Sequence, residues 1–190
     1  MNSSSPSAAA AAFYAIDPVH THLEFAVRHL MISTVRGTFK DVQGTVQAGG
    51  PGAGTTAVTV TVNLASLDTR EPQRDAHLKS PDFFDADRFP QMTFRSRRVD
   101  GPTDRPFKLA GDLTIRDVTR EVVLDVVPEG QGMDPWGHER AGFSATGKLS
   151  RGAFGLTYNQ VLEAGGVVIG DEVKISIDVE LVKQPVPQAI

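Results

Sequence analysis

The sequence predicts an all-β domain of about eight antiparallel strands with one short helical excursion. Two observations carry this prediction: apolar and polar residues alternate in most segments, and one charged segment breaks the alternation. Alternation with a period of two is typical of strands that bury one face and leave the other in water. Successive strands with short connections favour an up-and-down barrel over a sandwich, because closure removes the exposed edges of the sheet.

The expected strands follow one another along the chain. Alternation is clearest in residues 58–64 and 173–181, where Val, Ile or Leu occupies every second position. A tight hairpin turn is expected around Asp117, between two of the later strands. Weaker alternation marks the remaining strands, which we expect within residues 22–27, 36–46, 90–96, 107–115, 119–127 and 141–150.

Residues 69–90 form the expected helical excursion, because they carry charged and helix-forming residues without alternation. Pro72 suits the first turn of a helix, and Pro81 and Pro90 mark where helical structure ends. The glycine-rich segment 47–56 is expected to be a turn, and residues 129–142 a loop between two late strands.

The chain is expected to form a single domain. Its 190 residues are enough to bury a full core. Residues 13–184 are expected to form the β-barrel domain, between a disordered tail at residues 1–12 and a short tail at residues 185–190. Residues 1–12 lack the basic and leucine-rich regions of an export signal, so we expect a cytoplasmic protein.

Composition excludes several classes of protein. A net charge of -4 with scattered Lys and Arg argues against a nucleic-acid partner. The absence of cysteine excludes disulfides, thiol catalysis and thiolate metal sites. No apolar run approaches the roughly 20 residues of a membrane span, so no transmembrane segment is expected.

Three of the five histidines lie between residues 20 and 29. His20, His22 and Glu24 share one face of the expected strand, where neighbouring histidines lie about 6–7 Å apart and could bind one metal ion. Arg28 shares this face, however, and the side chain of His29 lies on the opposite face of the strand. We therefore expect exposed or hydrogen-bonded histidines and no cofactor, and we keep a metal-dependent enzyme as the alternative.

Four blocks of sequence carry a family resemblance. Residues 14–39, 67–96, 109–126 and 142–156 resemble, in this order, the motifs of the YceI-like family of polyisoprenoid-binding proteins, and the resemblance covers about residues 14–183. It implies a lipocalin-like barrel of eight antiparallel strands around a long hydrophobic tunnel for isoprenoid chains, and it makes a homodimer plausible. Thr21 replaces the usual serine, and Ala153 stands where an acidic residue is common in the family.

The resemblance and the alternation together give an expected tunnel lining. Ten phenylalanines against two tyrosines and one tryptophan fit a lining that needs area without polar groups. His29, Arg74 and Asp75 are the candidates for orienting a head group near the mouth. The expected lining residues are Phe25, Val27, Phe39, Val60, Val62, Leu64, Phe84, Phe89, Met92, Phe94, Leu113, Ile115, Phe143, Ile175 and Ile177.

The expected function is that of a soluble carrier of a long-chain isoprenoid, such as a quinone or a polyprenyl compound, or of a similar fatty amphiphile. Burial of a five-carbon unit contributes roughly 3–4 kcal/mol, so a few units exceed an association cost of about 4–15 kcal/mol. Besides the metal-dependent enzyme, a second alternative is a filled barrel that acts as an interaction module through residues 47–56 and 129–142.

Overall fold

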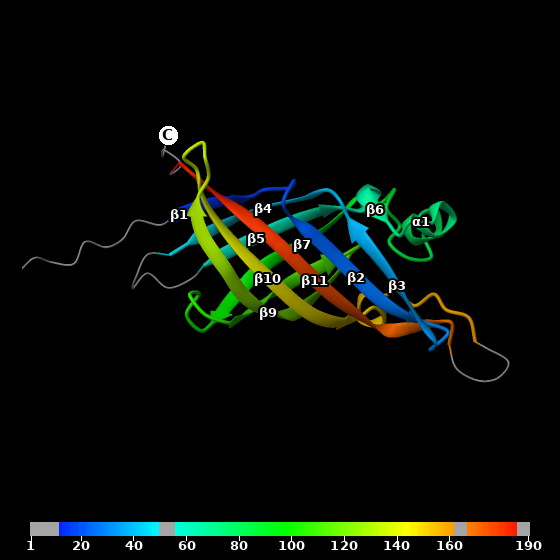
Figure 1. Cartoon of the computed structure of the whole chain (residues 1–190). Helices are drawn as coiled ribbons and strands as arrows, with labels where there is room; N and C mark the ends of the chain where they lie inside the picture. Colours follow the sequence, from blue (N-terminus) through cyan, green and yellow to red (C-terminus); the bar gives the residue numbers. More distant parts are fainter. Residues whose placement is uncertain (1–11, 50–55, 162–166, 186–190) are drawn as a thin grey trace, which may run out of the picture.

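The computed structural model describes residues 12–49, 56–161 and 167–185. Eight strands form a closed antiparallel ring, which confirms the predicted barrel (Figure 1). The ring closes where the first strand pairs with the last. In the order in which they neighbour one another, its members are β1 (Ala12–Ile16), β4 (Val42–Ala48), β5 (Ala57–Asn63), β7 (Gln91–Asp100), β8 (Phe107–Ile115), β9 (Val118–Met133), β10 (Glu139–Ser150) and β11 (Ile169–Gln184).

Three more strands continue the wall at one end of the barrel. β11 pairs with β1 through its C-terminal end and with β2 (His22–His29) through its N-terminal part. β2 then pairs with β3 (Ser33–Phe39), which pairs with the short β6 (Leu67–Asp68). The β2–β3 turn and the segment before β11 therefore lie together at the end of the barrel that is on the right in Figure 1.

The helical excursion contains α1 (Pro72–Lys79), which confirms the prediction for this segment. Pro72 occupies the first turn, where a missing N–H leaves no hydrogen bond unmade. The carboxylate of Glu71 caps the helix by accepting hydrogen bonds from the N–H groups of Gln73 and Arg74. Two short 3₁₀ helices, η1 (Leu64–Ser66) and η2 (Gly152–Phe154), complete the helical structure that is described. Within the described residues, every helix is too short or too polar to cross a bilayer.

The predicted hairpin turn near Asp117 is present, because β8 ends at Ile115 and β9 begins at Val118. The predicted loop at 129–142 is wrong: β9 and β10 remain paired to Met133 and Glu139, which leaves only residues 134–138 as the turn. A shift in register at Gly142 and Phe143 and the positive φ of Gly130 allow pairing to continue past Pro128.

Strand β1 was not among the predicted strands, and it begins at Ala12, the last residue of the predicted tail. The rest of that tail lies outside the described residues, as do residues 186–190 of the predicted C-terminal tail. Most of the predicted turn at 47–56 also lies outside them, although β4 extends to Ala48 and β5 begins at Ala57.

Candidate ligand-binding interior

Two clusters of apolar side chains fill part of the barrel. The larger one is built mainly from β7, β8 and β9, and includes Phe154 and Leu156 from the segment after β10. The smaller one surrounds Leu64, whose side chain is completely buried. Val60, Phe84 and Met92 pack against both clusters and so connect them.

The predicted lining residues divide between these clusters. Phe94, Leu113, Ile115, Phe143 and Ile177 belong to or pack against the larger cluster. Phe25, Phe39, Val62 and Leu64 belong to or pack against the smaller one. Phe84, from the excursion, meets Phe39 edge to face with 6.0 Å between ring centroids, so the excursion contributes an aromatic ring to the interior.

A third group of apolar side chains lies on β2 and β11 near the right-hand end of the barrel. Val173 and Ile175 flank the exposed Lys174 on β11 and point to the inner face, and they pair with Val27 and Phe25 on β2, which lie on the same face. Val27, Val173 and Ile175 stay partly exposed, and they are not among the described side chains that pack against either cluster. These three side chains therefore form a stretch of the inner face that is apolar and only partly buried.

The excursion places Phe89 differently from Phe84. Phe89 packs under two guanidinium groups, with Arg88 at 5.1 Å and Arg116 at 5.9 Å from the ring centroid. It is absent from the two clusters as far as the described residues show. This cation–π packing favours a position at the edge of the barrel for Phe89.

Arg74 and Asp75, two of the predicted mouth residues, converge on Thr69. Asp75 accepts hydrogen bonds from the N–H and the hydroxyl of Thr69, at 2.8 and 2.5 Å. Arg74 donates to the hydroxyl and to the carbonyl oxygen of Thr69, at 2.8 and 2.7 Å. Thr69 is buried, so these bonds fasten α1 to the strand that precedes it. Both side chains are therefore committed to a structural contact.

His29, the third predicted mouth residue, lies apart from this contact. It ends β2, pairs with Ser33 and Ile169, and has the same parity as Val27. Its place next to the β2–β3 turn puts a polar ring at the right-hand end of the partly exposed inner face. The structure thus brings Arg74 and Asp75 together and separates His29 from them.

The sequence analysis missed a cluster of rings that closes the excursion against the segment after η2. His77, Phe83 and Tyr158 have ring centroids 4.8 to 5.2 Å apart. Only the pair of phenylalanines at 83 and 84 hinted at burial, because the partners from residues 77 and 158 are distant in the sequence.

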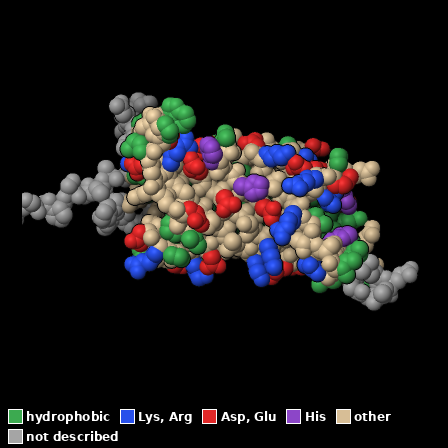
Figure 2. Space-filling model, viewed as in Figure 1, with side chains coloured by type: hydrophobic (Ala, Val, Ile, Leu, Met, Phe, Trp, Pro, Cys, Tyr) green, Lys and Arg blue, Asp and Glu red, His purple; other side chains and the backbone are tan. Residues whose placement is uncertain are grey.

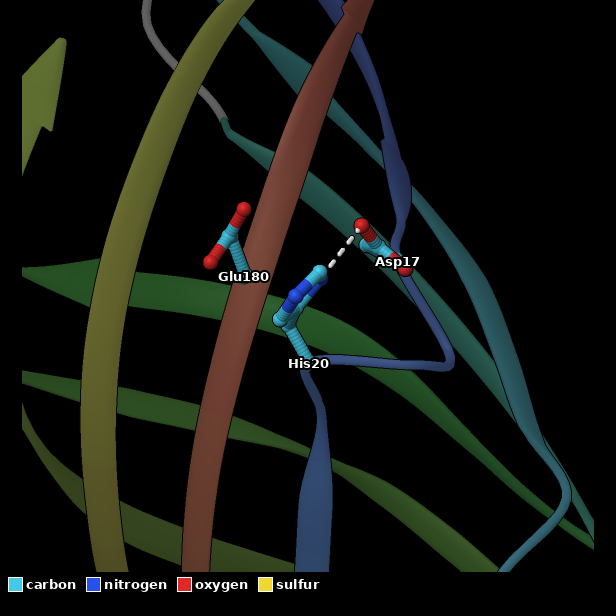
Figure 3. Close-up of side chains that lie close together, drawn as sticks. All are labelled: Asp17, His20 and Glu180. Atoms are coloured by element: carbon cyan, nitrogen blue, oxygen red, sulfur yellow. Dashed lines mark hydrogen bonds and ion pairs between the residues drawn. The ribbon is translucent and has the colours of Figure 1, made fainter. Parts of the chain in front are cut away.

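His20, His22 and Glu24, the metal ligands of the alternative that was kept open, do not converge on one point. Glu24 accepts a hydrogen bond from Arg36 at 2.7 Å, and His22 is exposed on the outer face. His20 lies instead beside Asp17, with 2.9 Å between Nδ1 and Oδ2. Among the described residues, the side chains that could share an ion are those of Asp17, His20 and Glu180 (Figure 3).

Arg140 already occupies this second group. Its Nη1 donates to Asp17 at 2.7 Å and to Glu180 at 2.5 Å, and its Nε donates to Asp134 at 2.8 Å. Hydrogen bonds from His20 and Arg140 lower the pKa of Asp17 to about 2. The carboxylates of Asp134, Asp17 and Glu180 in turn raise the pKa of Arg140. The group is a charge network that joins three segments on the outer face, here called the Arg140 network.

The fold and the apolar interior define a lipocalin-like antiparallel barrel. The chain belongs to the YceI family, since the model of the YceI-like domain matches residues 14–181. UPF0312 proteins of Staphylococcus aureus are similar to it, at 37% identity over 168 residues that cover 88% of this chain and 95% of theirs. The resemblance found in the sequence is thereby confirmed.

Solved structures agree with this assignment. A Campylobacter jejuni YceI protein is 32% identical, with a TM-score of 0.69 over 83% of this chain and 90% of that one. Burkholderia cenocepacia BcnA shares the fold at 21% identity, with a TM-score of 0.74 over 87% of this chain and 98% of that one. A polyisoprenoid binding domain from Saccharophagus degradans shares it at 14% identity, with a TM-score of 0.65 over 90% of this chain and 98% of the domain.

Proposed function

We propose that this protein binds a long-chain isoprenoid, such as a quinone or a polyprenyl compound, or a similar amphiphile, and carries it inside the barrel. The observation that carries the proposal is the inner face at Val27, Val173 and Ile175, which is apolar, points inward and remains partly exposed. The name of the Saccharophagus domain with the same fold supports an isoprenoid as the ligand.

The physical basis of binding is the burial of the hydrocarbon tail. Each buried methylene group contributes about 0.8 kcal/mol, and a polar group at the entrance is enough to orient the head group. We propose His29 for that role, because Arg74 and Asp75 are engaged with Thr69. Binding of this kind needs no covalent step, so the proposal is a binding protein and not an enzyme. The cytoplasmic location and the homodimer stay predictions.

The direct experiment has two parts. Mass spectrometry of an organic extract of the purified protein should reveal a lipid with a long isoprenoid or alkyl tail. Titration of the extracted protein with a long-chain quinone should then show saturable binding, and the same head group without its tail should not bind. An empty extract together with no binding of the quinone would contradict the proposal.

A pair of variants locates the site. Ile175→Trp adds a bulky ring to the inner face and should weaken binding of the long-chain quinone by about tenfold or more, since it takes the volume that the tail needs. Val123→Trp adds the same ring to the outer face of β9, where Val123 is 40% exposed, and should leave binding unchanged. Urea denaturation of both variants checks that they remain folded.

A further inference from the structure

The right-hand end of the barrel presents exposed apolar side chains. Met31 and Ile32, in the β2–β3 turn, are 58% and 80% exposed, and Val161 is 83% exposed. The N–H of Leu30 donates to the carbonyl oxygen of Val168 at 2.8 Å, and the segment that contains Val168 pairs back on Val161. We call Met31, Ile32 and Val161 the apolar tip, because these contacts hold them at one end of the molecule (Figure 1).

The backbone of the turn that carries the tip has an unfavourable conformation. Leu30 and Met31 both have positive φ, 50° and 60°, and Ile32 N–H donates to His29 carbonyl oxygen across the turn. Two successive turn residues with positive φ are preferably Asn-Gly, because residues with large side chains avoid positive φ. Here the two central positions hold large apolar residues instead. Strain kept at an exposed site points to a use for the side chains that it presents.

Two cations lie on the outer face of the strands that lead to the tip. Arg28 donates to the Met31 carbonyl oxygen, and Lys174 lies opposite Ala26 on the neighbouring strand. Neither cation forms an ion pair with a carboxylate among the described residues. Figure 2 shows Lys and Arg side chains gathering over the right half of the face formed by β2, β10 and β11.

Two acidic side chains on β11, close to Lys174 in the sequence, have other partners. Glu172 forms an ion pair with Lys148 at 3.3 Å. Asp171 accepts a hydrogen bond from the N–H of Gly152 at 2.9 Å. The positive charge of Arg28 and Lys174 is therefore available to an anionic surface.

We propose that the apolar tip docks on an anionic phospholipid bilayer. Met31, Ile32 and Val161 enter the boundary between head groups and acyl chains, while Arg28 and Lys174 contact lipid phosphates. The proposal rests on the proposed function for its purpose: Val27 and His29 lie just before the tip on β2, so docking brings the inner face to the lipid phase that dissolves isoprenoid chains.

The opposite end of the barrel offers a weaker alternative. Met133 and Trp136 are exposed in and beside the β9–β10 turn, at 71% and 77%. The nearest guanidinium group, that of Arg140, is occupied by Asp134 and two other carboxylates. This end therefore combines apolar side chains with a neutralised cation, and its single tryptophan reports on any contact with lipid.

The experiment is co-sedimentation of the full chain with vesicles. The protein should bind vesicles made of equal parts phosphatidylglycerol and phosphatidylcholine more strongly than vesicles of phosphatidylcholine alone, and added salt should weaken binding. Ile32→Asp should reduce binding to the anionic vesicles by at least about tenfold. Met133→Asp makes a matched change at the opposite end and should have no effect, and Trp136 emission should not shift.

Two double variants separate loss of vesicle binding from loss of folding. Leu30→Asn with Met31→Gly installs the preferred turn, so it should raise the urea midpoint of unfolding while it lowers vesicle binding severalfold. Arg28→Gln with Lys174→Gln should reduce binding to anionic vesicles to the level seen with neutral ones. Binding that survives these changes would overturn the proposal.

Three other results would contradict docking of the apolar tip on a bilayer. No binding to vesicles, a blue shift of Trp136 emission, or a concentration-dependent dimer that Ile32→Asp disrupts would each overturn docking by the apolar tip. Solution titration with a long-chain quinone, without vesicles, separates the two proposals. If the quinone binds and the vesicles do not, only docking is wrong; if the vesicles bind and the quinone does not, only the proposed ligand is wrong.

Discussion

Gly37 illustrates how one position controls the inner face. It pairs with Phe25, whose ring covers it. A β-carbon at residue 37 would lie 2.4 Å from Cζ of Phe25 and 2.8 Å from Cγ2 of Thr69. Contacts this short cannot exist, so any side chain at this position must displace the ring. The glycine is needed here for close approach.

The substitution Gly37→Ala should therefore destabilise the protein by about 1–3 kcal/mol, because the Phe25 ring has to leave its position in the smaller cluster. Urea denaturation measures the change in the free energy of unfolding. Gly132→Ala is the matched control, since no atom lies within 4 Å of its added β-carbon. Equal destabilisation by both substitutions would show that close packing at residue 37 is not the cause.

At the scale of an element, α1 is held in place by a side chain from its own first turn. Asp75 is the acceptor for both the N–H and the hydroxyl of buried Thr69. Asp75→Ala leaves a buried N–H without an acceptor, so it should cost about 1–3 kcal/mol and increase hydrogen exchange in α1. Asp82→Ala removes an exposed pair with His77 and should cost less than about 1 kcal/mol. Unchanged exchange in the first variant would contradict the role given to Asp75.

Most elements could be predicted from the sequence because alternation encodes the two faces of a strand. β5 and β11 follow it closely, and Pro72 marks the start of the helix. The continuation of β9 and β10 could not be predicted, since Pro128 and Gly130 resemble loop residues until the partner strand and its register are known. β1 is five residues long, and its pairing with β4 and β11 comes only from the folded barrel.

Alternation along a strand also predicts which side chains point inward, but it does not predict which of them pack against a cluster. Phe25 and Val27 share one face of β2, yet only Phe25 packs against a cluster. The difference depends on side chains from distant segments, such as Phe84. The hydrogen bonds of Arg74 and Asp75 with Thr69 were missed for the same reason, because the burial of Thr69 arises from tertiary packing.

At the scale of the whole molecule, the Arg140 network joins the β1–β2 connection, the β9–β10 turn and β11. The network should make the free energy of unfolding depend on pH in the acidic range. The pKa of Asp17 falls from 3.8 to about 2 on folding. Although desolvation opposes it, hydrogen bonds from Arg140 and His138 also lower the pKa of Asp134. Carboxyl groups with a lowered pKa contribute stability above their unfolded value, and this contribution is lost as the pH falls through the folded value.

The free energy of unfolding should consequently drop as the pH falls from about 4 to about 2, where folded Asp17 takes up its proton, and the lowered pKa of Asp134 should continue the drop at still lower pH. Asp17→Asn should lower stability at neutral pH and flatten this drop. Asp104→Asn, at a side chain that is 81% exposed, serves as the control and should follow the parent protein. Urea midpoints measured across this range test the prediction, and parallel curves for parent and Asp17→Asn would contradict it.

The seam of the barrel has a consequence for the rate of folding. Phe13 pairs with Gln184 where the ring closes, and Phe25 pairs with Ile175 where the wall continues, so β11 joins segments from opposite ends of the sequence. Contacts of such high sequence separation form slowly, because the chain must lose the entropy of a long loop before they form. Refolding in milliseconds to seconds is therefore expected. Until the seam forms, the edges of β1 and β2 that β11 covers stay open to other chains, and dilute conditions should favour recovery of the native barrel.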